Sequence, residues 1–268
     1  MPKVKEIFTI MNEIAPPSLA EEWDSIGLQV GDPENKATGI MVALDASLGA
    51  LCKAFDAGLN VLITHHPLLF KGISSINLST YPGNIIKEAV RKEINIFSAH
   101  TNLDSASGGI NDILADLLGL TESSPLIPSN SAENATTGIG RIGLLDKEKS
   151  LKEVASIVKE KLGLDKVKVL GDISRNILRI SLCGGSGGSL ISMAAEKGSD
   201  LFISGDISYH QAREAEELGI ALIDAGHFSS ERIGVTSLVK RIGRELGEKG
   251  ITIPVEGFKG EEEPFALI

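Results

Sequence analysis

The stretch VLITHHPLLF, residues 61–70, places two adjacent histidines and a proline directly after an uncharged segment rich in β-branched residues. Val61–Thr64 has the composition of a buried parallel strand, which is apolar along its length instead of alternating with polar residues. Pro67 disfavours the α-helical region for His66, so the backbone stays extended where the strand ends. The stretch therefore predicts a buried strand whose carboxyl end carries two neighbouring imidazole groups.

Strand-like and helix-like segments alternate on both sides of this stretch. A helix is predicted over 3–14, a loop with a short apolar piece (26–30) over 19–36, strands over 39–44, 61–64 and 96–99, and helices over 48–60, 83–95 and 108–120. The pattern resumes with strands at 139–145, 166–170, 177–183, 200–204, 220–224 and 251–256, and helices at 150–162, 188–198, 207–218 and 228–248. This alternation is typical of an α/β protein with mainly parallel sheets covered by helices.

The chain of 268 residues is long enough for one large or two modest domains. Residues 121–138 are rich in Ser, Pro, Asn and Thr, which indicates a boundary. We therefore expect two α/β lobes, one formed by residues 1–125 and the other by residues 126–235. The segment 236–268 is expected to pack back on the first lobe.

Composition excludes several classes of function. The net charge of −10 and the absence of a basic cluster argue against nucleic acid as a partner. No apolar run reaches the roughly 18–20 residues of a membrane helix. Cys52 and Cys183 are far apart and read as reduced core thiols. Residues 1–17 mix acidic and basic side chains and do not resemble a secretory signal, so we expect a cytoplasmic location.

Metal-binding side chains follow the carboxyl ends of the predicted strands, where open parallel sheets bind ligands. The candidates are His65, His66, His100, Asp104, His227 and Glu231. His227 and Glu231 are four residues apart, so on a helix they share one face. Imidazole and carboxylate together suit Zn, Mn, Fe, Co or Ni and do not suit Ca. A single histidine at a strand end is more often structural, but three such ends together predict a metal site between the lobes.

Two other segments near this predicted site have an open role. CGGSGGS, residues 183–189, lies between a strand and a helix, so its glycines serve either tight packing or contact with a phosphate. EEWDSIGL, residues 21–28, holds the only tryptophan, Trp23, which is either a core residue or part of the rim of the site.

Six motifs together resemble the Nif-three-like family of dinuclear metal-centre proteins, often labelled GTP cyclohydrolase 1 type 2 homologs. They are EEWDSIGLQVGDP, ITHHPLLF, AHTNLDSASGGIND, CGGSGGSLI, SGDISYHQA and LIDAGHFSSE, in order over residues 21–231. The chain resembles the short form of the family, without its inserted middle domain. Ser25 and Phe228 stand where the family more often has Asn and Tyr.

The resemblance implies two divalent metal ions per chain and a toroidal homo-hexamer. Its implied ligands are His65, His66, Asp104 and His227, with Glu231 bridging both ions, while His100 lies outside the ligand set.

The expected function is a dinuclear-metal-dependent hydrolase of a small nucleotide-like or phosphorylated substrate. His100 or His210 would act as acid or base, because an imidazole titrates near neutral pH. The substrate phosphate would lie on Gly184, Gly185, Gly187 and Gly188. The alternative is a non-catalytic hexamer that binds or handles metal or docks a partner. The sequence does not decide between the two classes, and it leaves the metal open.

Overall fold

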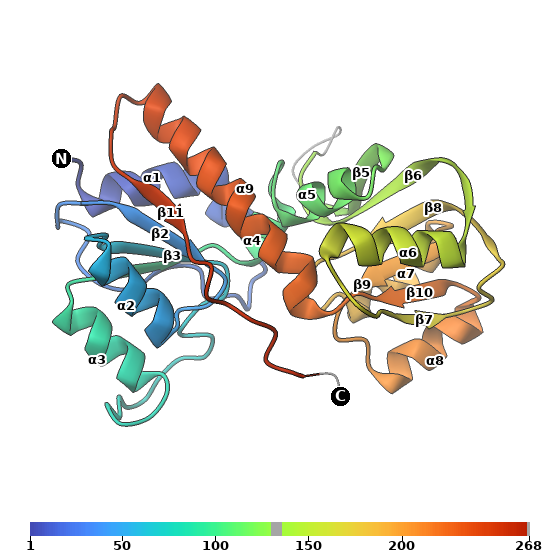
Figure 1. The fold of residues 1–268 in the computed structure, drawn as a ribbon, viewed down its shortest axis with the longest axis horizontal. Helices are drawn as coiled ribbons and strands as arrows, with labels where there is room; N and C mark the ends of the chain where they lie inside the picture. Colours follow the sequence, from blue (N-terminus) through green and yellow to red (C-terminus); the bar gives the residue numbers. More distant parts are fainter. Residues whose placement is uncertain (130–135, 267–268) are drawn as a thin grey trace. The chain divides into compact units, whose positions relative to one another are not determined.

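The computed structural model describes residues 1–129 and 136–266, which form a mixed α/β fold with two sheets (Figure 1). Contacts divide the chain into unit 1, Met1–Leu103 with Val235–Glu262, and unit 2, Asp104–Gly234 with Glu263–Ile268. This division differs from the boundary at residue 125 that composition suggests, because it assigns residues 104–125 to unit 2. The chain passes between the units within helix α4 (Thr101–Ser105), within helix α9 (His227–Glu248), and again after Glu262.

The sheet of unit 1 is mainly parallel, as the sequence predicts. Its strand order is β1 (Gly27–Val30), β4 (Asn95–Ser98), β3 (Val61–Thr64), β2 (Ile40–Ala43) and β11 (Val255–Gly257). Only β1, at one edge of the sheet, pairs antiparallel with its neighbour. It forms from the apolar piece of the segment expected to be a loop. Ala43 pairs with Thr64 and Thr64 with Ser98, so three carboxyl ends lie side by side.

Helices cover both faces of this sheet. Helices α2 (Leu48–Asp56) and α3 (Gly83–Arg91) pack on one face, against a core that includes Leu62 and Ile96. Helix α1 (Val4–Ile14) packs on the other face, where the rings of Phe8 and Phe97 stack at 4.7 Å. Ile96 and Phe97 serve opposite faces because successive strand residues alternate.

The sheet of unit 2 is mixed instead of mainly parallel. Its strand order is β5 (Thr121–Pro128), β6 (Gly138–Ser150), β8 (Asn176–Leu182), β9 (Leu201–Ser204), β10 (Ala221–Asp224) and β7 (Lys168–Leu170). The pairs β8–β9 and β9–β10 are parallel, and the remaining pairs are antiparallel. The parallel strands are the ones that carry the predicted site residues.

Strand β5 lies where composition indicated a boundary. Its residues include Pro125 and Pro128, which cannot donate a backbone hydrogen bond. Proline is tolerated in β5 because this strand is at the edge of the sheet, with β6 on one side only. Residues 130–135 of that segment lie outside the described residues.

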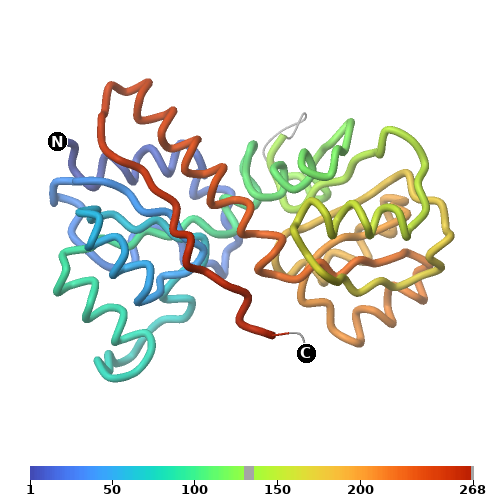
Figure 2. The backbone as a smooth tube through the Cα atoms, in the orientation of Figure 1, coloured from blue at the N-terminus to red at the C-terminus, as the bar shows by residue number. Residues whose placement is uncertain are grey.

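Alternating side chains of unit 2 build two apolar layers. Leu201 and Ile203 face helices α5 (Ile110–Leu117) and α6 (Leu151–Leu162). Phe202 faces the other way, towards α7 (Ile191–Glu196) and α8 (Tyr209–Leu218). The backbone trace shows these helices on either side of the sheet (Figure 2). The sequence predicted each of these helices, with α7 shorter than expected and preceded by a 3-10 turn at Gly188–Leu190.

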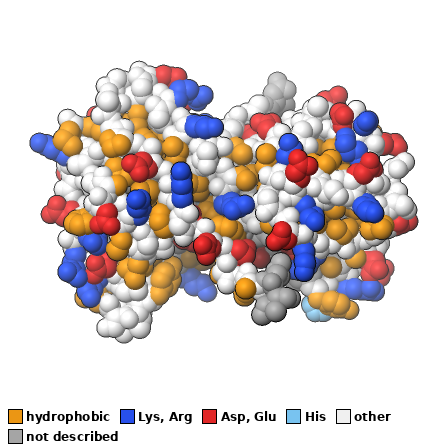
Figure 3. Space-filling view, viewed as in Figure 1, with side chains coloured by type: hydrophobic (Ala, Val, Ile, Leu, Met, Phe, Trp, Pro, Cys, Tyr) orange, Lys and Arg blue, Asp and Glu red, His pale blue; other side chains and the backbone are white. Residues whose placement is uncertain are grey.

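Charged side chains of both signs are interspersed on the visible face of each unit (Figure 3). Within the described part of the chain, no helix is both long and apolar enough to cross a membrane.

Candidate metal centre

Three histidines gather at the carboxyl edge of the sheet in unit 1. His65 and His66 follow β3, and His100 follows the adjacent β4, so the strand register brings them together. One ring nitrogen of each lies within 4.8 Å of the others. The ring centroids of His65 and His100 are 5.1 Å apart, and those of His65 and His66 are also 5.1 Å apart. These residues form a group that could hold a metal ion.

Each imidazole of the His-His pair is oriented through its Nδ1 atom. His65 is buried, and its Nδ1–H donates to the carbonyl oxygen of Ala99 at 3.0 Å. His66 Nδ1–H donates at 3.0 Å to the carboxylate of Asp45, which follows the carboxyl end of β2. Because a carbonyl or carboxylate oxygen can only accept, the hydrogen is on Nδ1, and Nε2 carries the lone pair. Metal-binding histidines in proteins have this arrangement.

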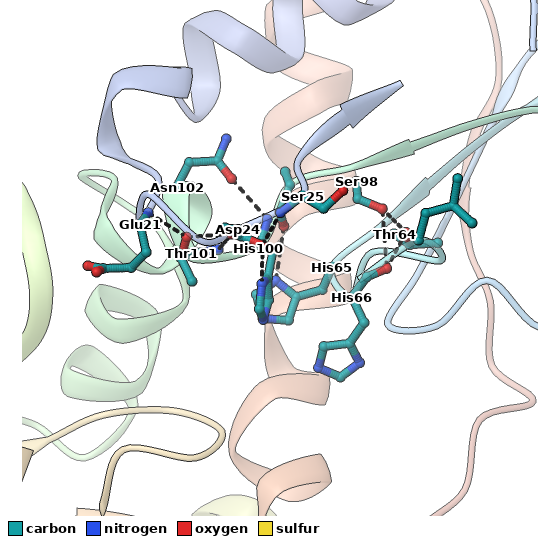
Figure 4. A network of polar contacts seen from close by, with 12 residues as sticks. Glu21, Asp24, Ser25, Thr64, His65, His66, Ser98, His100, Thr101 and Asn102 are labelled. Carbon is teal, nitrogen blue, oxygen red and sulfur yellow. Dashed lines mark hydrogen bonds and ion pairs between the residues drawn. The ribbon is translucent and has the colours of Figure 1, made fainter. Parts of the chain in front are cut away.

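His100 is oriented by a buried carboxylate. Its Nδ1–H donates to Asp24 Oδ1 at 2.9 Å, and the backbone N–H of Thr101 donates to Asp24 Oδ2 at 3.0 Å (Figure 4). Burial alone would raise the pKa of Asp24, but the hydrogen bonds from His100 and Thr101 outweigh it and hold that pKa well below its ordinary range. Asp24 is therefore an ionised partner of His100 at neutral pH.

A second group lies at the carboxyl edge of the sheet in unit 2. His227 begins α9 soon after β10, and Asp206 follows the adjacent strand β9. His227 Nδ1–H donates to Asp206 Oδ2 at 2.8 Å, and His227 Nε2 lies 3.1 Å from Glu231 Oε2. With the hydrogen of His227 on Nδ1, a lone pair of Nε2 and a lone pair of Glu231 Oε2 would face each other at 3.1 Å unless a cation lies between them. Either a second proton or a metal ion fits this arrangement.

Asp104 belongs to the same neighbourhood as Glu231. Asn111 links Asp104 to the glycine-rich loop, since its side-chain N–H donates to the carbonyl oxygen of Asp104 at 3.1 Å and its Oδ1 accepts from Gly184 N–H at 2.8 Å. Glu231 lies against the same glycine, because a Cβ atom on Gly184 would be 3.6 Å from Glu231 Cγ. Burial raises the pKa of the Cys183 thiol well above its ordinary range, and the carboxylates of Asp104 and Glu231 raise it further. Cys183 is therefore a neutral thiol at neutral pH, next to the carboxylates of Asp104 and Glu231.

The glycine-rich loop contacts Glu231 directly. A Cβ atom on Gly185 would lie 2.0 Å from Glu231 Oε1, and Gly185 has a φ of +62°. The N–H groups of Gly184, Gly185 and Gly187 donate to Asn111, Ser230 and Ser204, respectively. Each of these three N–H groups already has an acceptor within the protein. These hydrogen bonds do not support the predicted contact between the loop and a substrate phosphate, which stays a prediction. The loop instead leaves space for the carboxylate.

His210 is exposed in the first turn of α8, beside the ring of Tyr209. Among the described residues, it is not part of either group of potential metal ligands. Sequence reasoning did not identify the orienting roles of Asp45, Asp206 and Asn111. The one available signal was position, because Asp45 and Asp206 each follow the end of a predicted strand.

The fold and these side chains define a two-sheet α/β protein with histidine and glutamate groups that could bind a metal ion. A model of the Duf34/NIF3 (NGG1p interacting factor 3) family matches residues 2–264. The chain belongs to this family, as the six sequence motifs indicated.

Relatives of known sequence agree with this membership. A Clostridium acetobutylicum protein named GTP cyclohydrolase 1 type 2 homolog is 38% identical over 263 residues, which cover 98% of each chain. A Clostridium perfringens protein of the same name is 38% identical over 229 residues, covering 85% of this chain and 87% of the relative.

Solved structures share the fold. A Bacillus cereus protein described as related to NIF3 has a TM-score of 0.94 at 24% identity, covering 100% of this chain and 99% of its own. A Staphylococcus aureus hypothetical protein has a TM-score of 0.93 at 30% identity, covering 99% of both chains.

Proposed function

We propose that this chain is a metal-dependent hydrolase that acts on a small phosphorylated or nucleotide-like substrate. Its ligands to two divalent cations would be His65, His66, Asp104, His227 and Glu231. The observation that carries the proposal is the common orientation of three histidines. His65, His66 and His227 each direct Nδ1–H to an oxygen, so Nε2 of each would be the ligand atom.

The donor set fits divalent transition metals. Imidazole nitrogens and carboxylate oxygens suit Zn, Mn, Fe, Co or Ni, and the thiol of Cys183 is held neutral by its burial. When bound, a pair of such cations lowers the pKa of a water molecule and polarises a phosphoryl or carbonyl oxygen of the substrate. Glu231 would use both carboxylate oxygens, while Asp104 would add a second negative charge.

His100 is the residue proposed to move a proton during the reaction. Its Nδ1–H is held by the ionised Asp24, and its ring adjoins those of His65 and His66. With Nδ1 engaged in this way, Nε2 is the ring nitrogen of His100 that would accept or release the proton. His210, exposed on α8, is the weaker candidate for this role, because no contact places it beside His100, His227 or Glu231 in the described part of the chain.

The test combines metal analysis with a substrate panel. Elemental analysis of protein purified without added metal should give a metal content near two ions per chain, and chelation should abolish turnover. The panel contains simple phosphoesters, nucleoside mono-, di- and triphosphates, and GTP, because the relatives are named GTP cyclohydrolase 1 type 2 homologs. Metal bound at this ratio without turnover of any compound would reject the hydrolase and favour the metal-handling class.

Asp206 provides a prediction that needs no substrate. The Asp206→Asn variant should bind metal about 10–100-fold more weakly, because the carboxylate that orients His227 and increases its basicity is lost. Asn tolerates the positive φ of +53° found at this position, so the backbone conformation is retained. Competition titration with a chelator measures the affinity.

The matched control for this variant is Asp165→Asn, which changes an exposed carboxylate in the same unit. Equal metal affinity of the two variants would contradict the orienting role of Asp206.

A further inference from the structure

Two large aromatic side chains are exposed beside the histidine cluster of unit 1. The side chains of Trp23 and Phe70 are 58% and 49% exposed. Their ring centroids are 5.7 Å apart, and they lie 6.1 Å and 6.2 Å from the ring of His100, which each meets edge-on. Aromatic residues make up only 4% of the chain, and Trp23 is its single tryptophan. Phe55, Tyr81 and Tyr209 are exposed as well, so exposure alone does not distinguish the pair. Its distinguishing feature is that the two rings contact each other and adjoin the histidine cluster.

The backbone that carries both rings is held in place. Gln29, in β1, donates from its side-chain amide to the carbonyl oxygen of Ser25 at 2.9 Å and accepts from the N–H of Leu69 at 3.0 Å. Gln29 thereby links the segment of Trp23 to the segment of Phe70. On the other side of Trp23, the backbone N–H of Glu21 donates to the hydroxyl of Thr101 at 3.0 Å. The backbone segments that carry the two rings are thus anchored to each other, which reduces the entropy cost of ordering them around a ligand.

The geometry points to a subsite, formed by Trp23 and Phe70, for a planar aromatic or heteroaromatic ring of the substrate. An aromatic face gains favourable stacking with another ring, and this contact needs no specific hydrogen bonds. The inference rests on the proposed function, because it takes the ligand of this subsite to be the substrate of the hydrolase. It adds that the substrate carries a ring and that the ring lies next to His100.

Charge indicates which end of the substrate this subsite accepts. Glu21 and Glu22 precede Trp23, both residues are exposed, and Asp24 follows with an ionised carboxylate. A phosphate group would be repelled by these carboxylates, whereas a neutral or cationic ring would not. The subsite is therefore assigned to the ring and not to the phosphate of the substrate.

Trp23 makes the inference directly measurable, because all tryptophan fluorescence of the chain comes from this residue. Phenyl phosphate and cyclohexyl phosphate are a matched pair of probes with the same charge and nearly the same size. Phenyl phosphate should quench the fluorescence of the metal-loaded protein in a saturable way, and cyclohexyl phosphate should bind about tenfold more weakly. Guanosine monophosphate and ribose 5-phosphate provide a second pair, with and without a base.

A matched pair of variants locates the effect. Phe70→Leu should weaken phenyl phosphate binding by about tenfold. Phe55→Leu should leave it unchanged. Phe55 is similarly exposed, at 51%, but lies near the end of α2, which runs back from the carboxyl edge of the sheet. Calorimetric titration of Trp23→Leu, which lacks the fluorophore, should show a similar loss of affinity.

The outcomes separate this inference from the hydrolase proposal. Ring-dependent quenching without turnover would reject the hydrolase and support the subsite. Equal binding of phenyl and cyclohexyl phosphate, with turnover intact, would overturn the subsite alone. Fluorescence that changes on dilution of the protein but not on addition of the ring compounds would also overturn the subsite. This result would show that a second copy of the chain covers Trp23 and Phe70.

Discussion

The Glu231→Ala variant is expected to lose turnover by a factor of roughly 10³ or more, with little change in the secondary structure of the protein. Glu231 is buried, and its Oε2 lies 3.1 Å from His227 Nε2. A pair of cations contributes several kcal/mol to the transition state, and each 1.36 kcal/mol lost slows the reaction about tenfold. Removal of the proposed bridging carboxylate should therefore abolish most of the activity. Steady-state kinetics on the best substrate of the panel measures the loss.

Two further variants make this result interpretable. Glu231→Gln keeps the size of the side chain above Gly185 but removes its charge, and it should be as inactive as Glu231→Ala. Glu248→Ala, at the far end of the same helix, removes an exposed carboxylate and should retain full activity. Full activity in the Glu231→Gln variant would show that the negative charge is not required and would refute the bridging role.

The sequence predicted which potential metal ligands lie at strand ends, because a residue that directly follows an apolar run in the sequence also follows the strand in the fold. His65 and His66 follow an apolar run, and His227 with Glu231 has helical spacing. Which strands are adjacent then decides which side chains meet, and parallel α/β units pair their strands predictably. The structure accordingly brings His100 beside the His-His pair, through the adjacent strands β3 and β4.

The orienting side chains could not be predicted in the same way. Asp45 accepts a hydrogen bond from His66, and Asp206 accepts one from His227. In both cases the turn after a strand (β2 or β9) places the carboxylate next to the histidine that follows the neighbouring strand. Such turns depend on backbone angles that one sequence does not specify, including the positive φ of Asp206. Strand β5 was missed for a related reason. Its composition is that of a loop, and its pairing with β6 is a long-range property.

The buried guanidinium of Arg141 leads to the largest expected change in stability. Its side chain is 1% exposed and forms an ion pair with Asp112 in the first turn of α5. Its Nη1 also donates to the carbonyl oxygens of Gly138 and Gly140, at 2.7 Å each. Asp112→Ala should lower the free energy of unfolding by about 3–5 kcal/mol, because an uncompensated charge would remain buried. Urea denaturation followed by circular dichroism measures the change.

A double-mutant cycle distinguishes a lost charge partner from a general defect in α5. Arg141→Met in the Asp112→Ala background should recover part of the loss, because an apolar side chain of similar length removes the unpaired charge. Asp116→Ala, at an exposed position of α5, should change the free energy of unfolding by no more than about 0.5 kcal/mol. If Asp112→Ala is as mild as Asp116→Ala, the ion pair does not stabilise unit 2, and the carbonyl oxygens alone compensate the charge of Arg141.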